Sequence, residues 1–470
     1  MTIPPALAAT RPPLAILYLA LAFPAVLFQV FGTPPFQMPD EPRHFMRALQ
    51  IADGHLLARR SGDAFSGGDL EKAAQDVALA FTPLAHDRTM RLDPSLLARL
   101  APLRWGVTAK VPAMFENTAI YPPLLYLPAA LAIRIGKSID LSILRTYYLA
   151  RLAMGLVGVL GAALAVHLCV AGRTVLFVAL SLPLALSAFG SVSQDGLAIT
   201  AGALAIAAWS RSLSSVDAMS VKTRACVAVL LGAVIGARLP LLPLFALLAL
   251  PTSSRTRFGT RAGDLAASAL GLVPIGLGIV CASVAKIPFR ATDGVAPDLQ
   301  AALVLHAPGR ALQALWNTVA HHGAEFLREM VSVLGWWSDM LPSFYYGWIG
   351  ACLAAAALVE ASLPLPDFPR WAKLATLAIV VTACIGVFAS FYVAWTPVGS
   401  ETIEGVQGRY FIVPCLLLVL ALPRAGLPVA ASGTPGPARL RGTMQVTICA
   451  AVGMLNLWAI PITLLTRYYF

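Results

Sequence analysis

The sequence predicts an all-α polytopic membrane protein with about 11 transmembrane helices and two large external loops. Hydrophobic residues make up 58% of the 470-residue chain and charged residues only 12%, against roughly a quarter charged in an ordinary soluble domain. Several apolar stretches approach the roughly 20 residues needed to cross a bilayer. Lysines and arginines gather in short clusters between these stretches, as the positive-inside rule expects.

The composition also excludes several functions. A formal charge of +11 raises the question of nucleic-acid binding, but the basic residues follow the membrane topology and form no continuous basic segment. The seven cysteines lie within or beside apolar segments without CxxC spacing, which argues against a disulfide framework or a zinc site. We therefore expect membrane lipids around the chain and no nucleic-acid partner.

The basic clusters set the predicted orientation. We place in the cytoplasm Arg173, the cluster from Arg211 to Arg224, the cluster from Arg255 to Arg261, Arg370 with Lys373, and the cluster from Arg424 to Arg441. The predicted spans are then 13–31, 147–170, 174–190, 196–210, two crossings within 225–250 that meet at Arg238-Leu239-Pro240, 264–285, 346–363, 372–395, 409–424 and 444–463.

The chain is predicted to form a single membrane domain, 1–470, with a first external loop at 32–146 and a second at 286–345. The apolar segment 119–136 would reverse every later loop if it crossed, so we interpret it as interfacial. The first apolar segment is interpreted as a transmembrane helix, because Pro34-Pro35 follows it in place of a small-residue cleavage site.

Under this topology the unusual polar residues converge on the external face. Asp40 and Glu41 follow the first span, Asp195 precedes the fourth, Arg238 stands at a predicted helix break, and the run 401–409 precedes the tenth. The orientation was assigned from the basic clusters alone, so the convergence of these polar residues is an independent observation. It predicts one external active site.

The motif Met38-Pro39-Asp40-Glu41-Pro42-Arg43-His44 admits two interpretations. Pro42 suits a first helical turn that Asp40 or Glu41 could cap. The two carboxylates could instead accept a proton from an acceptor hydroxyl, or bind a divalent cation. A cofactor, if one is used, is expected to be a metal ion held by Asp40 and Glu41.

The other polar groups also have structural alternatives. Asp195 could cap the following helix, and a carboxylate at membrane depth usually faces a cavity or a partner. Arg238 and Arg409 suit phosphate oxygens, although either could snorkel to the interface. His321 and His322, followed by Glu325 and Glu329, could bind a metal but fit a solvated amphipathic helix better.

Taken together, these motifs resemble a bacterial family of multispanning membrane proteins of unknown function that is distantly related to the GT-C glycosyltransferases. The matching features are Pro39-Asp40-Glu41-Pro42 with His44, Ile51-Ala52-Asp53-Gly54, Tyr121-Pro122-Pro123 with Tyr126, Arg151, Ser193 with Asp195, Leu334-Gly335-Trp336 with Leu341-Pro342, and Gly405 with Gln407-Gly408-Arg409-Tyr410-Phe411.

The resemblance implies a GT-C-like fold in the cytoplasmic membrane, with the active site on the periplasmic face. It implies a polyprenyl-phosphate sugar donor, a glycan or lipid acceptor, and a cell-envelope product. Asp40 is then expected to act as base or to orient the acceptor, with Glu41 supporting it. The remaining expected donor-phosphate and substrate contacts are Arg409, Arg238, His44, Asp195, Gln407, Tyr410 and Tyr121.

Other functions stay open. A transporter or flippase for lipid-linked glycans would also need basic residues and a lateral cavity, but should show paired broken helices. A polymerase or ligase of surface glycans would differ only in its acceptor. A non-catalytic assembly subunit would tolerate loss of Asp40. The sequence identifies neither the sugar nor the acceptor.

Overall fold

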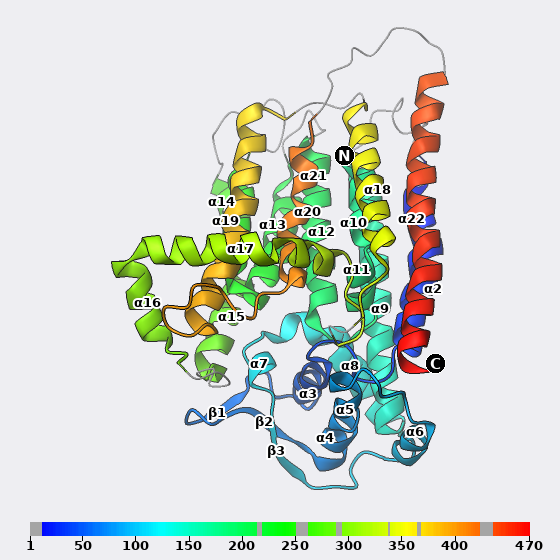
Figure 1. The fold of residues 1–470 in the computed structure, drawn as a ribbon, viewed down its shortest axis with the longest axis vertical. Helices are drawn as coiled ribbons and strands as arrows, with labels where there is room; N and C mark the ends of the chain where they lie inside the picture. The colour runs from blue at the N-terminus through cyan, green and yellow to red at the C-terminus, as the bar shows by residue number, and fades with distance from the viewer. Residues whose placement is uncertain are drawn as a thin grey trace.

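The computed structural model of the chain describes residues 12–213, 219–250, 262–287, 294–336, 339–363, 368–423 and 436–470. The described part is predominantly helical (Figure 1). Six of its helical segments are long and apolar enough to cross a membrane. They are α2 (Leu14–Gly32), α9 (Ile143–Leu168), the pair α14 (Ala262–Ala269) and α15 (Leu272–Ala285), α18 (Ser343–Ala361), α19 (Arg370–Ala394) and most of α22 (Gly436–Tyr468).

These six segments confirm a mostly helical membrane protein, while the count of about 11 spans stays a prediction. The other segments of the bundle are shorter or less apolar: α10 (Arg173–Leu180), α11 (Pro183–Phe189), α12 (Gln194–Leu213), α13 (Val221–Ala237), η2 (Leu239–Ala249), η3 (Gly408–Phe411), α20 (Ile412–Leu416) and α21 (Leu418–Ala421). The predicted basic cluster Arg255 to Arg261 and Arg424 lie outside the described residues.

The predicted span 174–190 is interrupted between α10 and α11. Pro183 lacks a backbone N–H and clashes with the preceding turn, which ends α10. The carbonyls that lose helical partners at the break accept hydrogen bonds from side chains. The Tyr18 hydroxyl donates to Leu180 O at 2.9 Å, and Asn456 Nδ2 donates to Ser181 O at 2.5 Å. Such replacement partners are needed where helices break at membrane depth.

The predicted break within 225–250 is confirmed. α13 ends at Ala237, Arg238 leaves helical geometry, and Leu239–Ala249 continues as a 3₁₀ run containing Pro240 and Pro243. Each proline removes a backbone donor. Arg238 is therefore carried on a short non-helical joint.

Residues 33–142, here called the head layer, lie at one end of the bundle, the lower end in Figure 1. A three-stranded antiparallel sheet in this layer, of order β1-β2-β3, was not predicted, although the described part of the chain is mostly helical. The elements are α3 (Glu41–Ala52), β1 (Arg59–Ser61), β2 (Phe65–Glu71), α4 (Lys72–Leu79), α5 (Thr82–His86), α6 (Pro94–Leu100), β3 (Lys110–Met114), α7 (Glu116–Ala119), η1 (Pro123–Tyr126) and α8 (Leu127–Ser138).

Of the apolar segment 119–136, whose crossing was in question, residues 127–136 lie in helix α8. Its 12 residues extend for roughly 18 Å, which is too short for a hydrocarbon core of about 30 Å. It packs instead along α9.

The head layer shares one hydrophobic core with the bundle. Phe45 and Leu49 of α3 and Tyr126 pack in the same buried cluster as Tyr147 and Met154 of α9. The second loop region contains α16 (Pro297–His306) and α17 (Pro308–Val331), and α17 runs across the direction of α18 and α19 in Figure 1. Both regions therefore approach the same end of the bundle.

Candidate functional site

The chain leaves α2 through a short loop that presents Asp40. Asp40 precedes α3 with φ of 60°, and Phe36 in the same loop has φ of 61°. Left-handed backbone is unfavourable for residues other than glycine, although aspartate tolerates it better than most. The Tyr147 hydroxyl accepts from Phe36 N at 2.8 Å and the two rings stack with centroids 4.0 Å apart, which holds the loop in this conformation.

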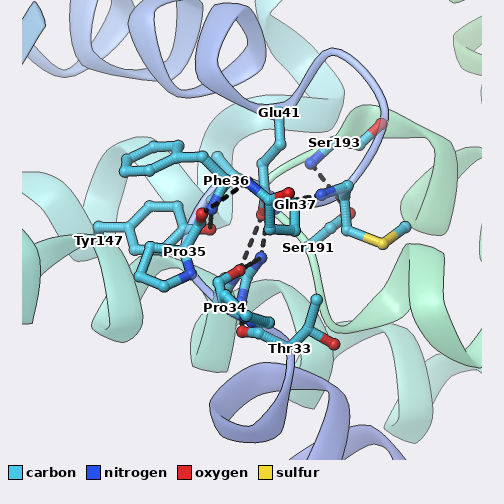
Figure 2. A network of polar contacts seen from close by, with 12 residues as sticks. Thr33, Pro34, Pro35, Phe36, Gln37, Glu41, Tyr147, Ser191 and Ser193 are labelled. Carbon is cyan, nitrogen blue, oxygen red and sulfur yellow. Dashed lines mark hydrogen bonds and ion pairs between the residues drawn. The ribbon is translucent and has the colours of Figure 1, made fainter. Parts of the chain in front are cut away.

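Glu41 lies beneath this loop and is paired with Arg151. Arg151 Nε and Nη2 donate to the two Glu41 oxygens at 2.9 and 2.5 Å, and neither side chain is exposed. The backbone N–H groups of Val192 and Met38 also donate to Glu41, at 3.0 and 3.3 Å. Figure 2 shows Glu41 pointing from α3 into the loop, with Tyr147 on one side and Ser191 and Ser193 on the other.

The expectation that Glu41 supports Asp40 chemically stays a prediction, but these contacts favour a positioning role. Arg151 also donates to Val30 O and Thr33 O, so the pair joins the end of α2 to α3 and α9. A buried carboxylate with both oxygens committed to a guanidinium has no free position for a substrate proton. We therefore assign Glu41 a positioning role.

The same geometry does not fit the predicted metal. Asp40 is bound by Arg409 and Asn117, whereas Glu41 is bound by Arg151, so the oxygens of the two carboxylates have separate cationic or amide partners. Among the described residues, no group of three or more His, Cys, Asp and Glu side chains is arranged to hold a metal ion.

Asp40, Asp195, Arg238 and Arg409 form the charged centre of the site. Arg409 Nη2 donates to Asp40 Oδ2 at 2.8 Å, and Arg409 Nη1 lies 3.7 Å from Asp195 Oδ2. Arg238 Nη2 donates to Asp195 Oδ1 at 2.5 Å. The side chain of Asp40 is 33% exposed and that of Arg409 only 12%, so Asp40 is the more accessible member of their pair.

The four charged groups come from four separate segments. Asp195 stands in the first turn of α12, where the partial positive charge of the helix terminus favours a carboxylate. Arg238 is on the joint between α13 and η2, and Arg409 is in η3. The predicted convergence of these residues is therefore observed in the structure.

Tyr410 and Tyr121 border the charged centre. The guanidinium carbon of Arg238 lies 4.4 Å from the Tyr410 ring centroid, a cation–π distance, and that of Arg409 lies 5.2 Å away. The Tyr121 ring is parallel to the His44 ring, with centroids 6.2 Å apart. Gln407 precedes η3, and its buried side-chain oxygen has no hydrogen-bond partner in the described part of the chain.

His44 connects α3 to η1 and to the start of α12. Its Nδ1 lies 2.6 Å from the Tyr126 hydroxyl, and its Nε2 lies 3.3 Å from Ser193 Oγ. Burial lowers the pKa of His44 to about 4, against the opposing effect of Asp195 and Asp40. The imidazole is therefore neutral at physiological pH, with one ring nitrogen donating and the other accepting.

The Asp40 carboxyl stays ionised. Burial acts to raise its pKa, but the Arg409 guanidinium and its hydrogen bond outweigh burial and hold the pKa of Asp40 below its usual value. A carboxylate of low pKa is a weak base but a strong hydrogen-bond acceptor. Asp40 is therefore suited to orient a hydroxyl group.

A pocket lined by both polar and apolar side chains adjoins these charges. Its polar lining comprises Ser191, Ser193, Asp195, Arg238, Arg409 and Tyr410. Its cavity volume of about 30 Å³ holds only a few water molecules. A larger ligand must therefore widen the pocket. The apolar lining comes from α11, α12, η2 and α20 and comprises Leu184, Ala188, Ala198, Ile199, Leu241, Ile412 and Val413.

Helix α17 approaches the site from the side. Glu329 Oε2 accepts from Gly408 N at 2.6 Å, next to Arg409, and burial raises the pKa of Glu329. His321 and His322 are exposed on α17, and His322 pairs with Glu325 at 3.2 Å. This agrees with the solvated-helix alternative for the two histidines.

Three contributors were missed or given a different role from the sequence. Arg151 is a charged residue within a predicted apolar span, and such a charge should have pointed to a buried carboxylate partner. Asn117 Nδ2 donates to Asp40 Oδ1 at 2.9 Å, and Glu329 binds Gly408 N. Nothing in the spacing of Asn117 or Glu329 indicated that they lie near Asp40 or Arg409.

A family model described as "Predicted membrane protein (DUF2142)" matches residues 23–419. This range includes the head layer, Asp195, Arg238 and Arg409. No curated protein and no solved structure matches the chain.

Proposed function

The chain belongs to this family of membrane proteins, and from that premise we propose that it is a glycosyltransferase of GT-C type that uses a polyprenyl-phosphate-linked sugar. The acceptor is a glycan or lipid of the bacterial cell envelope, and the reaction occurs on the external face of the cytoplasmic membrane.

One observation carries the proposal. Two carboxylates and two guanidiniums from four segments meet beside a pocket that Asp195, Arg238 and Arg409 line together with apolar side chains. A lipid-linked sugar phosphate combines the same two characters, an anionic head and a hydrocarbon chain. Guanidinium groups suit phosphate oxygens because they present several donors in a fixed plane.

The reaction assigns separate roles to the charged residues. An acceptor hydroxyl oriented by Asp40 attacks the anomeric carbon, and a new C–O bond forms as the bond from that carbon to the phosphate oxygen breaks. The hydroxyl proton passes to Asp40 and then to water, and the lipid phosphate leaves with the bonding electrons. Arg409 and Arg238 stabilise the charge that develops on it, which fixed donors do well where water is scarce.

The present pairing describes a state without substrate. Asp40, Asp195, Arg238 and Arg409 carry no net charge together, and each guanidinium is paired with a carboxylate. A phosphate that binds here must replace at least one of these contacts. Release of Asp40 from Arg409 would weaken the effect that holds its pKa down, and would make it a better base.

The direct test uses membrane vesicles from a strain that lacks the protein, supplied with the cell's own pool of lipid-linked sugars. Addition of the purified protein is expected to produce a new glycosidic product and free polyprenyl phosphate in equal amounts. Absence of both, from protein that remains folded, would exclude the transferase.

A second candidate function is transport of a lipid-linked glycan. The breaks at Ser181 and at Arg238 interrupt two segments of the bundle, and broken helices are common in transporters. A flippase would move labelled lipid-linked sugar between leaflets without forming a glycosidic bond. The vesicle experiment therefore separates the two candidates.

A further inference from the structure

Helix α17 has three different faces along its 24 residues. One faces the protein, one is apolar and exposed, and one is polar and exposed. A helix covered by water on its whole outer side would not need an apolar outer stripe.

The inner face of α17 holds the chain that leads to Arg409. Thr318 Oγ1 accepts from Ile403 N at 2.7 Å. Further along, Glu329 accepts from Gly408 N, and the Phe326 ring lies near the ring of Phe411. These three contacts follow one side of the helix, while Asn317, from the polar side, donates to Glu401 O at 3.1 Å.

The apolar outer face is formed by Leu312, Trp316, Val319 and Leu327. Their exposed fractions are 67%, 68%, 45% and 62%. Their spacing of four, three and eight residues places them on one stripe of a helix with 3.6 residues per turn. Large apolar side chains aligned in this way and left uncovered indicate a contact surface.

The polar outer face contains Arg310, Gln313, His321 and Arg328, all of them exposed. At 100° per residue, it is rotated by roughly 130° from the apolar stripe. A helix with its apolar stripe in lipid would therefore present these residues to water and lipid phosphates. The two cationic side chains suit the phosphates.

The apolar stripe continues the surface that faces lipid on a neighbouring span. Leu374, Leu377, Val381 and Ile385 of α19 are between 41% and 66% exposed, as expected of a helix bordered by acyl chains. Phe326 of α17 packs on Phe388 of the same span, with ring centroids 5.8 Å apart. α17 also runs across the direction of the spans (Figure 1).

We infer that α17 is an interfacial helix, which lies in the lipid–water boundary with Leu312, Trp316, Val319 and Leu327 in the bilayer, and that its seating there fixes the position of Arg409. The partner that covers the apolar face of α17 is therefore the lipid surface. The site is thereby held at a constant depth relative to the headgroups of lipids that diffuse toward it.

Gly408 allows close contact between α17 and the start of η3, which carries Arg409. A Cβ atom at this position would lie 2.3 Å from Phe326 O and 2.5 Å from Met330 N, distances that allow no side chain. The backbone before Arg409 is therefore in direct contact with the backbone of α17. A displacement of the helix must move this segment.

Tryptophan fluorescence of the full-length protein in lipid vesicles tests the location. The signal of Trp316 is obtained as the difference between wild type and Trp316→Phe. A matched probe on the polar face is His321→Trp in the Trp316→Phe background, since position 321 is exposed and roughly 140° from position 316 around the helix. Lipids brominated near the top of the acyl chain should quench Trp316 by at least twofold more than the probe at position 321, and aqueous iodide should show the opposite order.

Two outcomes would overturn the inference. Strong quenching of Trp316 by iodide would place the stripe in water. Protection of Trp316 from both quenchers would mean that protein covers it, either a second copy of the chain or another subunit. Neither reading depends on enzymatic activity, so the result is independent of the proposed function.

Hydrogen–deuterium exchange tests the coupling to the site. Trp316→Asp should lift the helix from the lipid and raise amide exchange several-fold in the segment 403–411, whereas Gln313→Asp should not. Leu312→Gln provides a milder variant if Trp316→Asp does not fold. Unchanged exchange in folded variants of the apolar face would show that lipid seating does not position Arg409.

Discussion

Arg409 donates to Asp40 at 2.8 Å, although 369 residues separate them in the chain. The contact joins η3 to the loop after α2 and closes the charged centre across the head layer and the bundle. Asp195 lies on the other side of the same guanidinium, with 3.7 Å between Arg409 Nη1 and Asp195 Oδ2. Arg409 is thus the link between the two carboxylates.

Replacement of Arg409 by lysine tests whether a planar guanidinium is needed. An ammonium keeps the charge but cannot contact Asp40 and Asp195 with two separate nitrogens. By comparison with other preorganised donors, we expect a fall of roughly 10²-fold in kcat for sugar transfer. Arg43→Lys is the matched control, because Arg43 pairs with Glu116 at the surface and its side chain is 38% exposed. Equal activity of the two variants would remove Arg409 from the site.

The buried pair of Glu41 and Arg151 predicts a characteristic pattern of stability. Arg151→Met leaves an unpaired buried carboxylate and should cost about 3–5 kcal/mol in the free energy of unfolding. The double variant Glu41→Leu with Arg151→Met should recover part of that loss, because no charge is then left alone. Thermal unfolding in detergent measures both. A double variant less stable than the single one would contradict the structural role of Glu41.

His44 predicts a dependence of stability on pH. Its pKa falls from 6.5 to about 4 on folding, so the unfolded chain binds more protons between these values and stability decreases as the pH falls. The full effect is about 3 kcal/mol, present above pH 6.5 and lost by pH 4. His44→Gln should flatten this part of the stability curve.

The Asp40 carboxyl affects the stability of the fold in a different pH range. Its lowered pKa contributes stability that is lost only as the pH falls below 3.8.

The charged groups facing His44 are Asp40, Asp195, Arg238 and Arg409. A curve for His44→Gln as steep as that of wild type between pH 6.5 and 4 would show that the imidazole does not carry the effect.

The position of Gly408 leaves no room for a side chain between η3 and α17. Gly408→Ala should separate η3 from α17, because its methyl group meets the α17 backbone, and we expect loss of both thermal stability and activity. Gly323→Ala is the control on α17 itself. Its Cβ would meet only Val319 Cγ1 at 3.6 Å, and alanine should stabilise the helix by up to about 1 kcal/mol. Equal effects would argue against the close contact.

The main features of the bundle and the convergence of the site could be predicted from the sequence. Long apolar segments identify spans by length alone. Asp195, Arg238 and Arg409 were recognisable because charged groups beside such segments are costly and usually have partners. The helix break at Arg238 followed from Pro240.

The head layer was less predictable, because its structure depends on contacts between distant segments. β1 has three residues and β2 contains Gly67 and Gly68, so neither shows the apolar alternation of a typical strand. The Cβ of an alanine at Gly67 would meet Ala113 O at 1.9 Å. Glycine there reflects close pairing with β3, which spacing alone does not indicate.

The separate surroundings of Glu41 were not predicted, for a related reason. Adjacent residues at a helix start point in different directions, so Asp40 faces Arg409 while Glu41 faces Arg151. The proximity of two carboxylates in sequence suggested a shared role. Arg151, a charged residue within a predicted apolar span, was the available signal for a separate one.

The most direct test of the central claim compares Asp40→Asn with Asp140→Asn in the transfer assay, at matched expression. Both residues have left-handed backbone, with φ of 60° and 53°, and asparagine tolerates that conformation. Asp140 lies in the head layer with its side chain 81% exposed. The proposed role of Asp40 predicts loss of sugar transfer in Asp40→Asn and normal transfer in Asp140→Asn. Full transfer by Asp40→Asn would contradict it.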